Sequence, residues 1–488
     1  MNKPLRRVAI FCGLLVLALL LRDNWLQYVR ADELNSHQKN RRVTIERYAN
    51  ERGNIIVDGK PITGSVDSKD PYYRFKRTYT DGPMWAPVTG YASQAYDASQ
   101  IEKIEDGILT GNDDRLFFDR TLAMFTGEKK TGGNVVTTLN GAAQKAAFKG
   151  LGDKKGAVAA IDPKTGRILA LASTPSYDPS SFAGYSGKDE KAWVALENDP
   201  DKPKLNRALR EIYPPGSVFK VVTAAAALEH GQVTDINAAT DTPEPYNIPL
   251  SRVPMKNHAQ GCKNASLNKA LEVSCNSVFA KLGDEVGREK MVETAEKFGF
   301  NAEQFVPIRA VASVYDKKMD RGGNAQSSIG QFNTATTPLQ MAMVAAAVAN
   351  DGKLMKPYMI DKLESPKLDV VKTTEPEEMS RPMSQKNAQL VQQMMENVVS
   401  NGTGGKADVD RPGVKVGGKT GTAQHGVGNK KRPYAWFISY AKTDSGSPVA
   451  VAVIVEDSAG TARDDISGGG LAAPIARDVM EAVLDSGK

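Results

Sequence analysis

Histidine and cysteine are scarce in this 488-residue chain, and their scarcity limits the chemistry that it can perform. The chain has four histidines and three cysteines, and neither residue type is grouped at the spacing that metal ligands require. We therefore predict no metal site and no cofactor. The histidines are interpreted as surface or structural residues: His37, His230, His258 and His425.

A concentrated positive charge is also absent. The formal net charge of +6 is spread along the chain without a basic block or interleaved aromatic residues. This pattern excludes nucleic acid from the expected partners. Hydrophobic residues make up 41% of the chain, which is enough for a core, and 488 residues are too many for one ordinary domain. We expect two domains.

One apolar run stands near the N-terminus, from Val8 to Leu21, after Lys3, Arg6 and Arg7. Its 14 residues are fewer than the roughly 20 that a membrane-spanning helix prefers, but no small-x-small cleavage site follows the run directly. We interpret residues 1–22 as a cytoplasmic tip and an uncleaved signal-anchor, with the rest of the chain outside the cell. A cleaved secretory peptide is the alternative.

Three short motifs follow one another along the chain: Ser217-x-x-Lys220, Ser274-x-Asn276 and Lys419-Thr420-Gly421. A serine acyl-transferase needs a nucleophile, a base, a proton relay and a cationic anchor for a carboxylate, and these motifs supply all four. Each motif type also occurs elsewhere, so order and local context must select among the matches. The other matches are Ser36–Lys39, Ser266–Lys269, Ser266–Asn268, Lys130–Gly132 and Lys164–Gly166.

The context of Ser217 favours a reactive position. Pro214, Pro215 and Gly216 disfavour helix before it, and the nearly all-apolar sequence after it predicts a buried helix. Ser217 would lie in the first turn of that helix, with Lys220 one turn deeper on the same face. Burial lowers the pKa of a lysine, which would let Lys220 act as the base.

The other two motifs also interrupt their surroundings. Ser274 and Asn276 place a polar pair inside an apolar helical stretch, which costs free energy unless the pair is used. Lys419 to Ala423 precede a loop rich in glycine and lysine and a returning strand, which predicts an edge strand. A peptide substrate could pair with that edge, while Lys419, Thr420 and Thr422 offer donors to its carboxylate.

Cys262 and Cys275 face an oxidising compartment if the chain is exported. A disulfide between them would brace the wall that carries Ser274 and Asn276. Two free buried thiols are the alternative, and the sequence leaves both open.

Apolar strands are predicted at 157–161 and 168–172 and again at 435–440 and 449–455, with a long helical region between the two pairs. Strands at both ends of a domain predict one antiparallel sheet and an α+β fold. Residues 23–150 are polar and mixed, and we expect them to form a separate non-catalytic domain. Residues 151–488 would form the catalytic domain.

The motif segments resemble the transpeptidase domain of the penicillin-binding proteins, over about residues 157–488. The segments are Tyr213–Lys220, Leu271–Ala280, Ser328–Gln331, Thr337–Ala342 and Lys419–Gln424. The anchor and the Arg52-Gly53 region resemble the pedestal of class B enzymes of the short actinobacterial A type. The resemblance implies a penicilloyl-serine transferase fold, β-lactamase-like, in which helices flank the antiparallel sheet.

The same resemblance implies roles for the residues. Ser217 would be the acylated nucleophile and Lys220 its base, and Ser274 and Asn276 would relay protons and hold substrate. Lys419, Thr420 and Thr422 would engage the substrate carboxylate, and Gly421 would also belong to the substrate-binding strand. The backbone amides of Ser217 and Thr422 would form the oxyanion hole.

The implied protein is a single-pass membrane enzyme with an extracellular catalytic domain. It would cross-link peptidoglycan stem peptides that end in D-Ala-D-Ala, release the terminal D-Ala and be acylated by β-lactams. A glycan polymerase and proteins of cell division or elongation are the partners that this implies.

Four other functions are consistent with parts of this pattern. A D,D-carboxypeptidase, a β-lactamase and a penicillin-sensing scaffold would carry the same motifs. The segment from Gly413 to Thr420 also satisfies the P-loop pattern Gly-x4-Gly-Lys-Thr, but no apolar strand leads into it and no helix follows. A nucleotide-binding function is therefore disfavoured.

Overall fold

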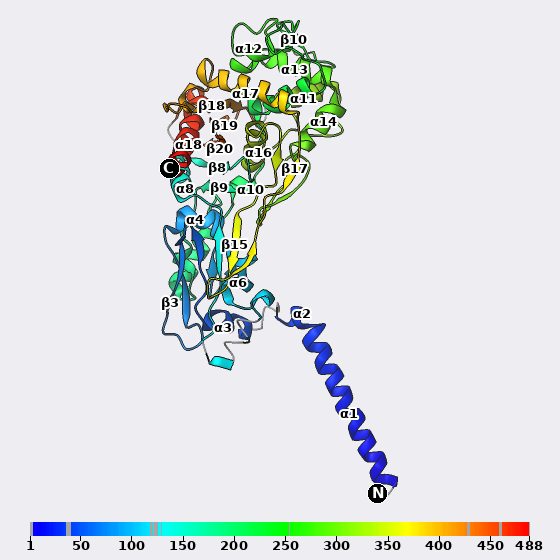
Figure 1. Cartoon of the computed structure of the whole chain (residues 1–488), viewed down its shortest axis with the longest axis vertical. Helices are drawn as coiled ribbons and strands as arrows, with labels where there is room; N and C mark the ends of the chain where they lie inside the picture. Colours follow the sequence, from blue (N-terminus) through cyan, green and yellow to red (C-terminus); the bar gives the residue numbers. More distant parts are fainter. Residues whose placement is uncertain are drawn as a thin grey trace.

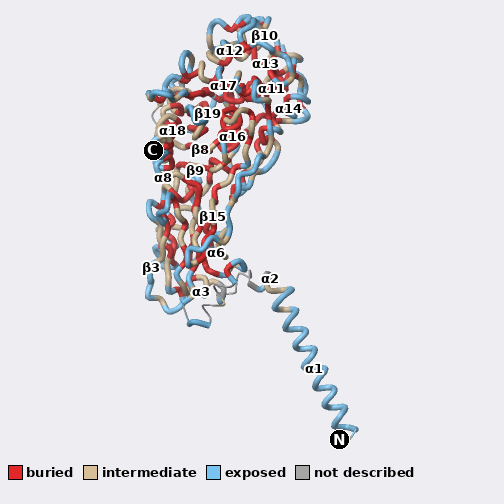
Figure 2. The backbone as a smooth tube through the Cα atoms, viewed as in Figure 1, coloured by how far each residue is buried: buried red, intermediate tan, exposed pale blue. Residues whose placement is uncertain are grey.

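The computed structural model describes residues 3–35, 41–117, 121, 125–127, 129–252, 254–426, 430–457 and 461–487. One long helix projects from an elongated body that has two stacked parts (Figure 1). The lower part is built mainly from the N-terminal third of the chain, and the upper part carries the C-terminus. Buried residues run through both parts of the body, whereas the projecting helix is exposed along its length (Figure 2).

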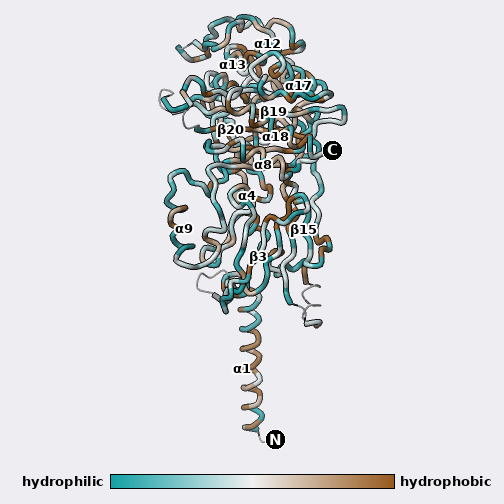
Figure 3. Tube along the Cα trace, turned by 90° about the vertical axis from the view of Figure 1, so that its left-hand side faces the viewer, coloured by the Kyte–Doolittle hydropathy of each residue, from teal (hydrophilic) through white to brown (hydrophobic). Residues whose placement is uncertain are grey.

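The projecting helix is α1, Lys3–Tyr28, with 26 residues. It extends beyond the apolar run at both ends and takes in Leu5, Trp25 and Leu26. At 1.5 Å per residue it is about 39 Å long, which exceeds the roughly 30 Å hydrocarbon core of a bilayer. Within the described residues it is the one helix long and apolar enough to cross a membrane. Its apolar middle is visible in Figure 3.

The lower part is organised around a five-stranded sheet in the order β16-β15-β7-β1-β2. β1 pairs in parallel with β7, and β15 pairs antiparallel with β7 on its other side. The polar segment 364–386 supplies β16 and the end of β15 to a sheet whose other strands come from the N-terminal third of the chain. The strands are β1 Ile55–Val57, β2 Lys60–Pro61, β7 Asn134–Thr137, β15 Ile360–Glu364 and β16 Val370–Thr373.

Short helices and hairpins complete the lower part. The helices are α2 Ala31–Asn35, α3 Arg41–Ala49, α4 Gly82–Thr89, α5 Gln100–Ile104, α6 Asp106–Thr110 and the single turn η1 Asp114–Leu116. The hairpins are β3 Thr63–Asp67 with β4 Phe75–Tyr79, and β5 Ala92–Ser93 with β6 Asp97–Ala98.

A buried charge cluster joins the elements of this part. The Glu102 carboxylate receives Arg52 Nε and Arg77 Nε, each at 2.6 Å, and Arg52 Nη1 lies 2.6 Å from Asp106 Oδ1. Glu102 and Arg77 side chains are wholly inaccessible to solvent. The neighbouring Gly53 has no room for a side chain, because a Cβ there would lie 1.8 Å from the carbonyl oxygen of Gly133. The Arg52-Gly53 segment is therefore tightly packed against several elements of the lower part.

The upper part contains an antiparallel sheet in the order β18-β19-β20-β8-β9. All four strands predicted from the apolar runs are present, and the α+β prediction is confirmed. β18 lies at the edge, as predicted, and β20 pairs with β8 from the start of the domain. The strands are β8 Lys155–Ile161, β9 Ile168–Thr174, β18 Lys415–Ala423, β19 Tyr434–Thr443 and β20 Gly446–Asp457.

Helices cover both faces of this sheet. Val158 and Ala160 of β8 share a core with α8 Gly141–Leu151 and α18 Ala473–Ser486. The alternate residues Ala157 and Ala159 share the other core with α16 Pro338–Ala349, whose residues are all buried. This alternation follows from the two-residue period of a strand.

The remaining helices and small hairpins are distributed over the body, from the top of the molecule (Figure 1) to the side of the lower part, where α9 lies (Figure 3). The helices are η2 Pro179–Phe182, α9 Gly187–Glu197, α10 Arg207–Arg210, η3 Gly216–Phe219, α11 Lys220–Glu229, α12 Leu267–Glu272, α13 Asn276–Val286, α14 Arg288–Lys297, α15 Arg321–Ser327, α17 Gln385–Ser400, η4 Gly405–Ala407, η6 Arg463–Asp465 and η7 Gly468–Ala472. The hairpins pair β10 Tyr246–Asn247 with β11 Pro254–Met255, β12 Gln304–Phe305 with β13 Arg309–Ala310, and β14 Leu354–Met355 with β17 Glu378–Ser380.

The competing motif matches have structural explanations. Lys164–Gly166 lies in the turn between β8 and β9. Ser266 caps α12, since its side chain accepts a hydrogen bond from the Lys269 amide. Ser36–Lys39 lies outside the described residues, as does His37.

Candidate active site

Ser217 lies in the turn η3, which leads directly into α11. The turn begins at Gly216 with a φ of +55°, a conformation that favours glycine. The Gly216 amide donates to the carbonyl of Gly330 at 2.9 Å, and the Trp436 indole donates to the carbonyl of Pro214 at 3.1 Å. The serine is half-buried, and the turn that carries it is held by residues from two distant parts of the chain.

Lys220, three residues after Ser217, is completely buried and joins two of the motifs. Its Nζ donates to Asn276 Oδ1 at 2.7 Å and to the Ser274 carbonyl at 2.8 Å, and it lies 3.2 Å from Ser274 Oγ. Burial, reinforced by the charge of Lys419, holds the pKa of the Lys220 amine well below its usual range. A lowered pKa favours the neutral amine, which is the form that can accept a proton.

The break between α12 and α13 positions Ser274 and Asn276. Ser274 has a φ of +65°, an uncommon conformation for a residue with a side chain, and Asn276 begins α13. Asn257, from the loop before α12, caps α13: its Oδ1 accepts from the amides of Asn276 at 2.6 Å and Ser277 at 3.0 Å. The polar pair predicted to interrupt a helical stretch therefore lies at a helix start.

A disulfide joins Cys262 to Cys275, with the two Cα atoms 5.5 Å apart. Cys275 stands between Ser274 and Asn276, and Cys262 belongs to the loop that carries Asn257. The same loop lines the cleft above Ser217 with Met255, His258 and Ala259. The disulfide thus connects the cleft wall to the motif that contacts Lys220.

We predict that Asn257→Ala lowers the free energy of unfolding by about 1 kcal/mol, because two amides at the start of α13 lose their acceptor. Lys263→Ala is the matched control, since Lys263 is exposed on the same loop. Urea unfolding of both variants measures the difference. Equal stability of the two variants would show that the cap does not matter.

The third motif lies within β18. Lys419 is completely buried, its Nζ donates to the Thr420 carbonyl at 3.0 Å, and burial lowers its pKa to about 7. Thr422 is exposed on the same strand. Gly421 allows the strand to approach the Ser217 turn, because a Cβ there would lie 3.0 Å from Val218 Cγ1. Lys419 and Thr420 lie inside an edge strand, and the described residues that follow lead into β19 and not into a helix, so the arrangement is not a P-loop.

A cleft of about 1190 Å³ brings the motifs together. The predicted residues that line it are Ser217, Ser274, Asn276, Thr420 and Thr422. Lys220 and Lys419 lie behind them and are completely buried. Sequence reasoning missed the other wall, which carries Thr403, Lys406 and Gly468–Gly470. No recognised motif marks these residues, and they reach the cleft only through the folded positions of η4 and η7.

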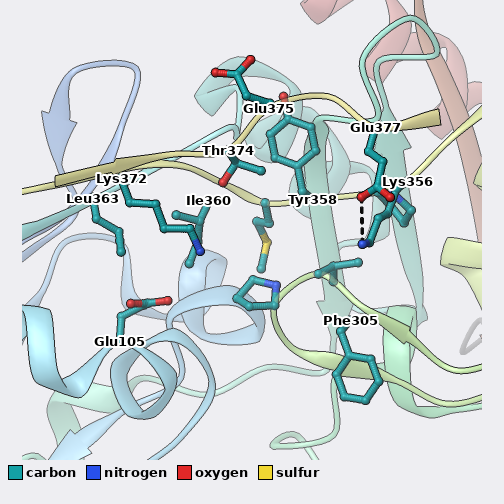
Figure 4. A pocket seen from close by; sticks show the side chains of 14 residues that line it. Glu105, Phe305, Lys356, Tyr358, Ile360, Leu363, Lys372, Thr374, Glu375 and Glu377 are labelled. Atoms are coloured by element: carbon teal, nitrogen blue, oxygen red, sulfur yellow. Dashed lines mark hydrogen bonds and ion pairs between the residues drawn. The ribbon is translucent and has the colours of Figure 1, made fainter. Parts of the chain in front are cut away.

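A smaller cavity of about 220 Å³ lies apart from this site, where β15 and β16 approach Phe305 (Figure 4). Lys356 and Glu377 form an ion pair beside it, with nitrogen and oxygen 3.0 Å apart. None of the described residues that line this cavity belongs to the three motifs. The cleft at Ser217 is therefore the candidate active site.

Comparison with known families agrees with this geometry. Residues 156–481 match the penicillin binding protein transpeptidase domain. The chain belongs to this family. Residues 52–135 match the penicillin binding protein A dimerisation domain, which covers most of the lower part. The resemblance to class B penicillin-binding proteins of the A type is confirmed.

Two mycobacterial proteins align with this chain over nearly its whole length. The chain is 39% identical over 503 aligned positions to the peptidoglycan D,D-transpeptidase PbpA of Mycolicibacterium smegmatis, which covers 100% of both chains. It is 38% identical over 498 positions to the peptidoglycan D,D-transpeptidase PbpA of Mycobacterium tuberculosis, covering 99% of each.

Solved structures of this family superpose well on the chain. The ceftriaxone acyl-enzyme complex of penicillin-binding protein A from M. tuberculosis matches with a TM-score of 0.83 and 37% identity, over 90% of this chain and 100% of that one. The penicillin G acyl-enzyme complex of the same protein matches with a TM-score of 0.82 and 37% identity, over 89% and 100%. The transpeptidase fold is thereby confirmed.

Proposed function

We propose that this protein is a serine D,D-transpeptidase that cross-links peptidoglycan stem peptides through an acyl-enzyme on Ser217. The observation that carries the proposal is the buried Lys220, which lies one helical turn beyond Ser217 and contacts both Ser274 and Asn276 at the base of the cleft. Full-length similarity to peptidoglycan D,D-transpeptidases of two mycobacteria supports the same activity.

In the first half of the reaction, Ser217 Oγ attacks the carbonyl carbon of the D-Ala-D-Ala peptide bond and its proton passes to the neutral Lys220 amine. The amides of Ser217 and Thr422 stabilise the oxyanion of the tetrahedral intermediate. When that intermediate collapses, the C–N bond breaks. The proton reaches the departing D-Ala nitrogen through Ser274, which lies 3.2 Å from Lys220 Nζ.

In the second half, an amine of a neighbouring stem peptide attacks the Ser217 ester. The amine loses its proton to Lys220, the ester C–O bond breaks, and Ser217 Oγ regains a proton. A β-lactam enters the same first step, but its leaving nitrogen stays attached to the acyl group. The adduct therefore persists, as the acyl-enzyme complexes of the M. tuberculosis relative illustrate.

Substrate binding is assigned to the edge strand. The extended peptide pairs with β18 beside Gly421, and its terminal carboxylate accepts hydrogen bonds from Thr420 and Thr422. Asn276 holds the peptide from the opposite wall, where it already contacts Lys220. Lys419 contributes from behind the strand, through its position and charge.

The helix α1 supports a location at the cell membrane. We assign α1 as a single membrane-spanning helix with Lys3, Arg6 and Arg7 on the cytoplasmic side and both domains outside the cell. The disulfide Cys262–Cys275 suits an oxidising compartment. Residues 23–150 are assigned to docking with a glycan polymerase and with division or elongation proteins, and residues 151–488 to transpeptidation.

The test uses the full chain in detergent with a pentapeptide that ends in D-Ala-D-Ala, with and without an amine acceptor. We expect D-Ala release together with a cross-linked product whose yield depends on the acceptor. Release of D-Ala without any cross-linked product would identify a D,D-carboxypeptidase. A stable penicillin adduct without D-Ala release would identify a penicillin-sensing scaffold.

A further inference from the structure

The cation expected to anchor the substrate carboxylate does not line the cleft. Lys419 is completely buried, and its ammonium donates to the Thr420 carbonyl within its own strand. Among the described residues that line the cleft, Lys406 is the single lysine, and no arginine accompanies it. Lys406 is exposed and lies in the turn η4, outside all three motifs.

A second residue of the same wall touches the motif directly. Thr403 Oγ1 lies 2.6 Å from Thr420 Oγ1, which is the shortest side-chain contact of the third motif. Thr420 is nearly buried, whereas Thr403 is exposed to the cleft. The pair places two hydroxyl groups side by side, at the point where β18 meets the wall formed by Thr403, Lys406 and Gly468–Gly470.

Glycines form the part of the wall next to this pair. Gly468 and Gly469 line the cleft, and neither has room for a larger residue. A Cβ at Gly468 would lie 2.7 Å from the Gly421 carbonyl oxygen, and a Cβ at Gly469 would lie 2.5 Å from the Thr403 carbonyl oxygen. The turn η7 therefore packs against both Thr403 and β18 and keeps the space beside the two hydroxyl groups open.

We propose that Thr403 and Lys406 complete the carboxylate-binding subsite: Thr403 orients the Thr420 hydroxyl toward the bound carboxylate, and Lys406 supplies positive charge at the mouth of the cleft. The inference rests on the proposed function, since it concerns the terminal carboxylate of the same donor peptide. It adds a positioning residue and a binding residue from segments that carry no known motif here.

The role of Thr403 follows from hydrogen-bond direction. A carboxylate has only acceptor atoms, so the single O–H of Thr420 must donate its hydrogen bond to the carboxylate. Thr403 then donates to Thr420 Oγ1, and the two bonds polarise each other. Without Thr403, the Thr420 hydroxyl is free to rotate away from the substrate. Lys406 acts at longer range, because an exposed ammonium attracts an anion in a manner that salt screens.

The test measures the second-order rate of Ser217 acylation by penicillin G, which carries a carboxylate, by intact mass of the full chain in detergent. We expect Thr403→Val to lower this rate roughly tenfold, the upper range for loss of a hydrogen bond between neutral groups. Thr403→Ser keeps the hydroxyl and is expected to restore the rate. In a Thr420→Val background, Thr403→Val should have little further effect, because the two residues act through one hydrogen-bonded chain.

Lys406 is tested by charge reversal. We expect Lys406→Glu to slow acylation several-fold at low salt, with the difference disappearing at about 1 M salt, where the screening length is about 3 Å. A Lys406 effect that does not change with salt would overturn the electrostatic role. Additive effects of Thr403→Val and Thr420→Val, or a Thr403→Ser variant as slow as Thr403→Val, would overturn the positioning role. If the parent chain itself forms no adduct, the proposed function fails instead.

Discussion

Lys220→Met is expected to lower the rate of Ser217 acylation by penicillin by about 10⁴-fold, the upper range for loss of a general base. Methionine fills a similar volume but cannot accept the Ser217 proton. The buried amine is the only charged or basic group that the structure places against both Ser274 and Asn276 among the described residues. Intact-mass time courses measure the rate.

The matched control is Lys145→Met, since Lys145 is exposed on α8 and has no part in the cleft. That variant should react like the parent. Thermal unfolding of both variants separates loss of the base from loss of the fold. An adduct on Lys220→Met that forms at the parental rate would remove Lys220 from the mechanism.

The pH dependence of acylation follows from the same lysine. Burial lowers the pKa of Lys220, so acylation should decline only as the pH falls through that lowered pKa. Lys419, with a pKa of about 7, contributes a positive charge below that pH, which further disfavours protonation of Lys220. Lys419→Met should therefore move the acid limb of the rate profile to higher pH.

The second large effect is expected in the lower part of the molecule, far from the cleft. Glu102→Ala should lower the free energy of unfolding by about 3–5 kcal/mol, because it leaves the buried Arg77 guanidinium without its counter-charge. Arg77 loses its ion pair outright, whereas Arg52 keeps its contact with Asp106. Urea unfolding measures the loss.

Glu46→Ala is the control, since Glu46 forms an exposed ion pair with Lys130, which is worth about 0–1 kcal/mol. The contribution of Glu102 should also depend on pH. Burial alone would raise its pKa, but Arg77 and Arg52 outweigh burial and hold the pKa below its ordinary value. The stabilisation is thus present above the unfolded pKa and is lost as the pH falls through the folded one. A Glu102→Ala variant as stable as Glu46→Ala would contradict this account.

Local sequence signals were enough to predict much of the upper part. The apolar composition of β8, β9, β19 and β20 is enough to predict each of them as a buried strand. The residues around Ser217 likewise predict a turn followed by a buried helix. These features depend on neighbours in the sequence, so they can be recognised before the fold is known.

Contacts between distant segments could not be predicted in the same way. β15 and β16 are short and partly polar, and only their pairing with β7 makes them strands of the lower sheet. Asn257 becomes a helix cap because a loop returns to α13, and Thr403 reaches Thr420 because α17, which ends just before Thr403, packs beside β18. None of these residues differs locally from an ordinary polar surface residue.

The most direct test of the account is the intact mass of the full chain after incubation with penicillin G, beside Ser217→Ala. We expect the parent to gain the mass of one penicilloyl group, to hold it for a long time and to carry it on the peptide that contains Ser217, whereas the variant gains none. An unmodified parent, or an adduct that persists in Ser217→Ala, would contradict the assignment of Ser217 as the acylated nucleophile.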